Sequence, residues 1–146
     1  MDNVDRKIIK LLQENARMPL KAIAEAVYMS SPAVAARIER LEEAGILTGF
    51  HAFVDENRIG FPVKAFINLD MEPTQKSEFY PFIKSISNVL ECDCVTGQYS
   101  MIIKVCYKDT TELDDFINDL QRFGKTSTQI VFSTSVEPRG ISMDVL

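Results

Sequence analysis

Residues 20 to 45 carry two short helical patterns with a tight break between them, and this arrangement restricts the possible folds more than any other feature. Apolar residues recur on one face of each pattern at helical spacing: Leu20, Ile23, Ala24 and Val27, then Val34, Ile38 and Leu41. Residues 28 to 30 separate the two patterns. Helices this short, joined by so tight a turn, suit a crossed helix-turn-helix, a motif that presents its second helix to a DNA major groove.

The second helix of this pair has clear start and stop signals. Either Ser30 or Ser31 can cap it, because a serine oxygen accepts a hydrogen bond from an otherwise unpaired amide. Pro32 then falls in the first turn, where its missing N–H removes no helical hydrogen bond. Gly45 follows the last apolar position and suits the left-handed residue that ends many helices. These signals predict a helix over residues 31–44.

A further helix precedes the pair, and an extended segment follows it. Val4, Ile8, Leu11 and Leu12 form the apolar stripe of a helix over residues 3–14, capped by Asp2 or Asn3. Together with helices over 20–27 and 31–44, it predicts a three-helix core. Residues 46–54 read as extended chain, either a wing or the start of a link out of the domain. Residues 55–62 are polar and contain Gly60 and Pro62, as linkers do.

The second half of the chain has a regular alternation of strand and helix patterns. Strands are predicted over residues 63–70, 89–96, 99–107 and 127–137, and helices over 74–86 and 110–123. The order βαββαβ predicts a ferredoxin-like antiparallel sheet with both helices on one face. The opposite face keeps apolar side chains such as Phe66 and Ile102, so we expect it to pack against a second copy. Residues 138–146 have no clear pattern; they either pack across a partner subunit or stay loose.

The predicted fold class is therefore α+β, with an N-terminal winged helix-turn-helix followed by a ferredoxin-like βαββαβ domain. We expect residues 1–54 to form the helix-turn-helix domain, residues 55–62 the linker, and residues 63–146 the second domain.

Charge and composition limit the functions and the locations that can be expected for this chain. The net charge of −5 lies entirely in residues 51–146, whereas residues 1–50 are neutral with seven basic and seven acidic residues. A neutral half can still present a basic face to nucleic acid. No apolar run approaches the roughly 18 residues of a membrane span, and the N-terminus lacks the apolar core of a signal peptide, so the expected location is the cytoplasm.

The residues that usually carry metal or catalytic chemistry are sparse. Three cysteines, Cys92, Cys94 and Cys106, argue against a disulfide framework, and Cys92 and Cys94 lack a second Cys or His pair to complete a metal site. We read Cys94 and Cys106 as small core residues. His51 is the single histidine, and no phosphate-binding glycine loop is present. We therefore expect no metal, no cofactor and no enzymatic activity.

Several segments together resemble one protein family. They are VDRKIIKLLQENAR, LKAIAEAVYMSSPAVAARIERLEEAGILTGFHAFVD, IGFPVKAFINLD and the VTGQYS turn. In order and spacing, over nearly the whole chain, they resemble the Lrp/AsnC family of bacterial and archaeal transcriptional regulators. The resemblance implies double-stranded DNA as a partner, dimers that often assemble into octamers of four dimers, and an amino acid or related small molecule bound between dimers.

The candidate DNA contacts lie on and around the second helix of the pair. Its N-terminal half would face the groove, with Arg37 reading a guanine edge or gripping phosphate. The candidates are Lys21, Ser30, Ser31, Ala33, Val34, Arg37 and Arg40. Because alanines dominate the reading positions, we expect modest sequence specificity, supplemented by DNA shape and by several heads on one assembly.

Two alternatives stand beside this interpretation. Arg37 and Arg40 can instead form surface ion pairs with Glu39 or Glu43. The head of a small-molecule-sensing oligomer can also contact protein and not DNA. An exposed face shared by Lys21, Ser31 and Arg37 would favour DNA.

The effector loop of the family maps onto the turn between the two middle strands, Thr96, Gly97, Gln98, Tyr99 and Ser100. Gly97 permits a positive φ and a close backbone approach. Relatives commonly carry Asp where Ser100 stands. If that Asp holds the amino group of a ligand, its loss removes a charge-assisted contact. The protein would then bind a different effector, bind weakly, or bind none. The loop can also be a plain turn at a subunit contact.

Overall fold

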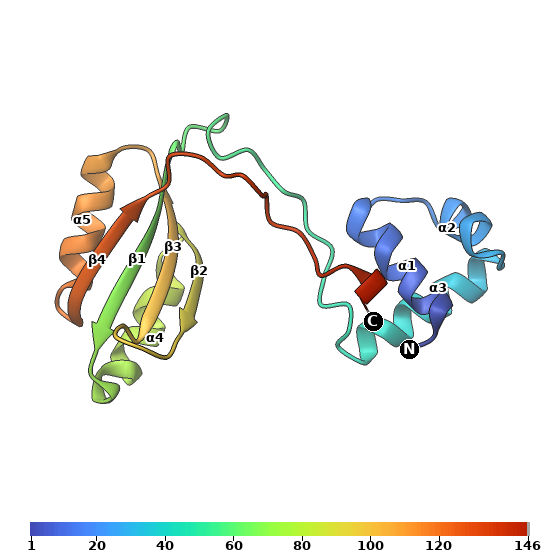
Figure 1. Ribbon diagram of the computed structural model, residues 1–146, viewed down its shortest axis with the longest axis horizontal. Helices are drawn as coiled ribbons and strands as arrows, with labels where there is room; N and C mark the ends of the chain where they lie inside the picture. Colours follow the sequence, from blue (N-terminus) through green and yellow to red (C-terminus); the bar gives the residue numbers. More distant parts are fainter. Residues whose placement is uncertain (146) are drawn as a thin grey trace. The chain divides into compact units, whose positions relative to one another are not determined.

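The computed structural model describes residues 1–145 and divides the chain into two compact units (Figure 1). One unit contains Met1–Phe53 together with the chain from Val136 onward, and the other contains Val54–Ser135. Two stretches of the chain therefore form the first unit, one before and one after the second unit. The predicted second domain, residues 63–146, extends further than the observed unit, because residues 136–145 belong with the helices. Residue 146 lies outside the described residues.

Three helices build the first unit: α1 (Asn3–Glu14), α2 (Leu20–Val27) and α3 (Ser31–Glu43). Their apolar stripes meet in one core, where Ile8, Ile23 and Val34 are at most 1 % exposed. Asp2 caps α1 in a capping box with Asp5, which satisfies free amides at the helix start. Ser30 caps α3, its Oγ accepting a hydrogen bond from the Ala33 amide at 3.4 Å. The predicted three-helix core is confirmed.

The predicted wing is not formed. None of residues 44–62 lies in a strand, although residues 46–54 carry an extended, apolar pattern. A wing needs two paired strands, and this segment finds no antiparallel partner among residues 1–145. The segment leads from the helical unit into the sheet unit, which agrees with the alternative prediction of a link out of the domain.

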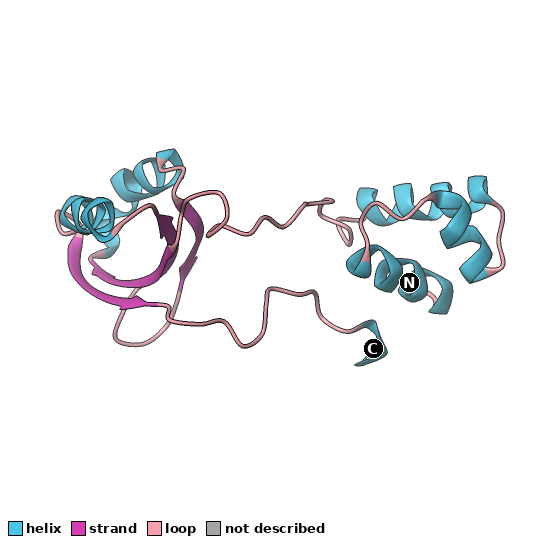
Figure 2. Ribbon diagram, turned by 90° about the horizontal axis from the view of Figure 1, so that it is seen from above, coloured by secondary structure: helices cyan, strands magenta, loops and turns pink. Residues whose placement is uncertain are grey.

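The second unit is a four-stranded antiparallel sheet with two helices packed on one face (Figures 1 and 2). Its elements follow the predicted βαββαβ order: β1 (Val63–Met71), η1 (Pro73–Gln75), α4 (Lys76–Ser85), β2 (Val89–Cys94), β3 (Met101–Tyr107), α5 (Thr110–Leu120) and β4 (Gly124–Ile130). The strand order is β2-β3-β1-β4, so β1 and β3 are central. Their inward side chains, such as Ile67 and Ile103, are fully buried beneath Phe79 and Leu120.

The last strand lies earlier in the chain than the sequence pattern predicts. Strand β4 runs over Gly124–Ile130, not 127–137, and α5 ends at Leu120. Gly124 pairs with Met71, and a Cβ on it would lie 1.8 Å from the backbone oxygen of Asp70. The glycine thus permits the close approach of the two strands.

The cysteines occupy different environments. Cys106 is buried as predicted, and its Sγ donates a hydrogen bond to the Phe61 carbonyl oxygen at 3.1 Å. Cys94 is exposed at the end of an edge strand, so its prediction as a core residue is wrong. Burial raises the pKa of the half-buried Cys92 thiol to about 11, which keeps it protonated at neutral pH.

The C-terminal segment returns to α1. Lys10 Nζ lies 2.9 Å from the Asp144 carboxylate, and Gln13 Nε2 donates to the Ile141 carbonyl oxygen at 3.3 Å. Asp144 lies within a short 3₁₀ turn, η2 (Met143–Val145). In the described part of the chain, no helix is both long and apolar enough to cross a membrane.

Candidate nucleic-acid interface

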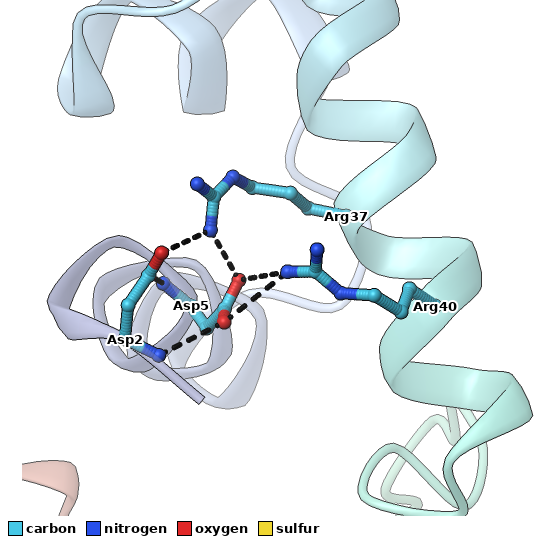
Figure 3. Close-up of polar contacts among 4 residues, drawn as sticks. All are labelled: Asp2, Asp5, Arg37 and Arg40. Atoms are coloured by element: carbon cyan, nitrogen blue, oxygen red, sulfur yellow. Dashed lines mark hydrogen bonds and ion pairs between the residues drawn. The ribbon is translucent and has the colours of Figure 1, made fainter.

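A buried carboxylate in α1 holds both arginines of α3 (Figure 3). Asp5 is 2 % exposed. Arg37 Nη1 donates to Asp2 Oδ2 and to Asp5 Oδ1, each at 2.7 Å. Arg40 Nη2 donates to the two carboxylate oxygens of Asp5 at 3.1 and 3.3 Å. Because the two hydrogens of Arg37 Nη1 are both used, its remaining donors are on Nη2 and Nε.

The network favours the charged forms of Asp2, Asp5 and Arg37. A hydrogen bond from the Asp5 amide, together with Arg37, lowers the pKa of Asp2 to about 2. Burial raises the pKa of Asp5, but the hydrogen bond from the Asp2 amide and the contact with Arg37 outweigh it, so the net shift is downward. The pKa of Arg37 is raised by its bonds to Asp2 and Asp5. At neutral pH two negative charges therefore offset two positive ones.

The sequence interpretation allowed ion pairs for these arginines but with other partners. Arg37 and Arg40 pair with Asp2 and Asp5 of α1, not with Glu39 or Glu43 of α3. Helical spacing indicates only ion pairs between residues three or four positions apart, whereas these partners are 32 to 35 positions apart. The two acids at the start of α1 are the sequence feature that indicates these ion pairs. They form the capping box of α1 and also pair with the arginines.

The first two turns of α3 expose small residues. Pro32 and Ala36 are exposed in its first two turns, while Ser31, Ala33 and Ala35 are half-buried. Val34 is fully buried in the core, so its prediction as a DNA contact is wrong. The apolar stripe that predicted the helix already assigned Val34 to the inner face. The N-terminus of α3 thus offers little side-chain bulk.

The predicted polar contacts do not share one face. Lys21 and Ser30 are exposed, but the side chain of Arg37 is only 22 % exposed and turns toward α1. Ser31 and Arg37 are six residues apart, which places them roughly 120° apart around a helix. Lys21, Ser31 and Arg37 therefore do not share the exposed face that would favour DNA.

One exposed residue next to α3 was not predicted. Tyr28, the C-cap of α2, has a left-handed backbone (φ 57°, ψ 45°) and a side chain that is 93 % exposed. The sequence signal is a bulky residue in a turn position that favours glycine.

The candidate effector loop connects β2 to β3. Thr96, Gly97 and Gln98 are exposed, Tyr99 and Ser100 are half-buried, and Gly97 has φ +109°. The Ser100 amide donates to the Leu69 carbonyl oxygen at 2.9 Å.

The hydroxyl of Ser100 is engaged by the end of β1. Its Oγ accepts a hydrogen bond from the Met71 amide at 2.8 Å, and its proton can go to the carbonyl oxygen of Leu69 at 3.1 Å or of Met71 at 3.3 Å. Ser100 therefore anchors the loop to the sheet, a role that the sequence did not indicate.

Comparison with known proteins identifies both units. Residues 1–42 match the AsnC-type helix-turn-helix domain, and residues 64–141 match the Lrp/AsnC ligand binding domain. The chain belongs to the Lrp/AsnC family. The HTH-type transcriptional regulator YezC of Bacillus subtilis is 35 % identical over 92 % of this chain and 96 % of its own length.

Solved Lrp/AsnC structures share the fold. Escherichia coli AsnC aligns with a TM-score of 0.86 and 27 % identity, over 97 % of this chain and 98 % of AsnC. A Neisseria meningitidis transcriptional regulator in complex with L-Met aligns with a TM-score of 0.87 and 22 % identity, over 95 % of this chain and 94 % of that one. The protein is thus a DNA-binding transcriptional regulator of the Lrp/AsnC type.

Proposed function

We propose that this regulator binds double-stranded DNA with the first two turns of α3 in the major groove. The observation that carries the proposal is the exposed, small surface formed by Pro32 and Ala36 beside the Ser30 cap. Small side chains let the helix backbone approach the groove closely, and the positive end of the helix dipole at its start suits phosphate oxygens. Lys21 and the hydroxyls of Ser30 and Ser31 would add phosphate contacts.

The arginines have a restricted role in this proposal. Arg37 keeps its Nη2 and Nε donors for a base edge or a phosphate, while Asp2 and Asp5 offset much of the charge of Arg37 and Arg40. The two arginines therefore orient the head on DNA more than they release counterions from the DNA phosphates. With few base-reading donors on α3, sequence specificity depends on DNA shape and on several heads acting together.

The open face of the sheet supports self-association. Phe66 is 37 % exposed there, and Ile102 is only partly buried, so a second copy would cover both. We propose a homodimer through this face and, by family resemblance, an octamer of four dimers. Acting on DNA, the protein would work in the cytoplasm of a bacterium or archaeon, with no enzymatic step.

We further propose that the loop Thr96–Ser100 takes a small effector at a contact between subunits. Support comes from its exposed turn with positive φ at Gly97, and from the L-Met bound to the Neisseria regulator. Backbone amides of the loop would meet a carboxylate. Because Ser100 carries no charge and is bonded to β1, an amino group would find no carboxylate at this position, so the effector is one that binds through its carboxylate.

The DNA proposal is tested by adding one negative charge at two places on the head. Ala36→Glu places a carboxylate on the exposed face of α3, and Ala16→Glu places one in the exposed α1–α2 turn. Fluorescence anisotropy with a random-sequence duplex measures binding. We expect Ala36→Glu to weaken binding at least tenfold and Ala16→Glu to change it by less than about threefold, since repulsion falls steeply with distance in salt. Equal effects of the two variants would contradict a groove-facing α3.

A further inference from the structure

Tyr28 is the one non-glycine residue with positive φ among residues 1–145. For an L-residue other than Gly, Asn or Asp, this left-handed conformation is unfavourable because Cβ approaches the following backbone. The conformation itself has a clear use, since the Tyr28 amide and the Met29 amide donate to carbonyls of the last turn of α2 and close the helix. Glycine would do this without strain, so the turn does not explain the tyrosine.

Packing within the head does not explain the side chain either. It is 93 % exposed, so it buries almost no apolar area in its own chain. Lys7 of α1 lies over the ring, with its Nζ 5.7 Å from the ring centroid. Lys7 is itself exposed, and its Nζ also donates to the Ala26 carbonyl oxygen. A strained residue whose side chain does not stabilise the fold points to a role in binding another molecule.

The position of Tyr28 identifies the role. It precedes the Ser30 cap of α3 by two residues, so the two Cα atoms are within roughly 7 Å of each other. The ring, the Lys7 ammonium and the N-terminus of α3 therefore lie at one end of the helix pair. A phenol hydroxyl and an ammonium are both donors, and with the positive end of the α3 dipole they suit an anion.

We propose that Tyr28 and Lys7 together bind a DNA backbone phosphate beside the N-terminus of α3. The proposal rests on the proposed function, in which α3 enters the major groove. Tyr28 donates its hydroxyl proton to a phosphate oxygen, and Lys7 supplies the positive charge while holding the ring. Both contacts are independent of base sequence, so they orient the head and do not select the operator.

The first experiment is Tyr28→Gly in the full chain. Glycine accepts the left-handed backbone, so we expect the thermal midpoint of the helical circular-dichroism signal to stay the same or rise. Affinity for a random-sequence duplex should fall roughly tenfold, because a hydrogen bond to a charged group is lost. Tyr28→Phe keeps the ring and should lose a similar factor. Binding like that of the parent protein would overturn the proposal, as would a lower thermal midpoint of Tyr28→Gly.

The second experiment compares two lysines of the same helix. Lys7→Met removes a charge that would contact phosphate, whereas Lys10→Met removes one that is paired with Asp144. We expect the slope of log affinity against log salt to become shallower by about 0.9 for Lys7→Met and to change little for Lys10→Met. Equal slopes for both variants would overturn the role of Lys7.

Ala36→Glu separates this proposal from the one on which it rests. If the parent protein binds duplex and Ala36→Glu does not, α3 is the reading helix; normal binding by Tyr28→Gly then overturns the role of Tyr28 alone. If the parent protein does not bind duplex at all, the proposed function fails, and the phosphate contact fails with it.

Discussion

At the scale of single residues, Asp5 determines the arrangement of the helical head more than any other charged group. It is buried at the start of α1, where it helps to cap the helix and accepts hydrogen bonds from Arg37 and Arg40 of α3. A buried carboxylate with such partners fixes geometry, because removing it leaves donors without their acceptor. The acids Asp2 and Asp5 of α1 thus orient α3 through its two arginines.

Asp5→Asn should destabilise the head strongly. The substitution removes the charge but keeps the size, and the loss of one partner from a buried ion pair costs about 3 kcal/mol. Denaturant unfolding followed by the helical signal measures this free energy. Asp55→Asn is a matched control, because Asp55 pairs with the 86 % exposed Arg58 and such surface pairs contribute less than about 1 kcal/mol. A similar, small loss for both variants would contradict the central role of Asp5.

The same carboxylates predict acid sensitivity. The pKa of Asp2 lies at about 2 against an ordinary value of 3.8, mainly because of the Asp5 amide and Arg37, and the pKa of Asp5 is also lowered. A lowered folded-state pKa stabilises the fold above the unfolded value, and this stability is lost as the pH falls through the folded value. We therefore expect the head to lose stability between about pH 4 and pH 2, measured by acid titration of the helical signal. A head whose stability is constant over that range would contradict the ion-pair network.

At the scale of elements, the strand β4 depends on close approach to β1 at its first residue. Gly124 lies against the Asp70 backbone, and the missing side chain allows the pairing with Met71. Backbone cannot move aside as a flexible side chain can, so a larger residue must displace the strand.

Gly124→Ala should lower the free energy of unfolding of the sheet unit by more than about 2 kcal/mol. Gly97→Ala is a useful comparison, because its Cβ would meet nothing within 4 Å and its cost comes only from φ +109°, about 1 kcal/mol. Thermal unfolding of both variants gives the ranking. If Gly124→Ala is the milder change, the close approach at the start of β4 is wrong.

The effector loop yields a prediction that uses the anchoring of Ser100. In Ser100→Asp the carboxylate can still accept from the Met71 amide, but it cannot donate to Leu69 or Met71, whose carbonyl oxygens repel it. We expect it to turn toward the loop and to strengthen amino-acid binding there. Titration calorimetry with the twenty amino acids compares the variant with the parent. No heat from either protein would contradict an effector pocket at this loop.

The sequence predicted elements well because their signals are local. Apolar spacing predicted α1 and α2 with the bounds that the structure has, and it predicted β1 to within one residue. The errors come from contacts between distant segments. The start of β4 was missed because Asp70, which lies against Gly124, is 54 residues away, and the partners of Arg37 lie in another helix. The return of residues 136–145 to α1 has no periodic signal.

At the scale of the whole molecule, the chain connects its two units twice. Residues from Val136 onward join the helical unit after the sheet is complete, and the Lys10–Asp144 pair attaches them to α1. The contact raises the pKa of Lys10 and lowers that of Asp144, both through their mutual hydrogen bond, as expected for an ion pair. A second copy on the open sheet face would bring two heads into one assembly, and affinity for paired sites would then exceed that of one head.

Selection of duplexes from a random DNA pool with the full chain tests the central claim most directly. If a two-fold dimer carries two heads that each place α3 in a major groove, the enriched sequences should contain an inverted repeat. Its half-sites should lie one helical turn, about 10 base pairs, or a multiple of it apart. Ala36→Glu should enrich nothing. A pool that stays random with the parent protein, or the same enrichment by Ala36→Glu, would contradict the account.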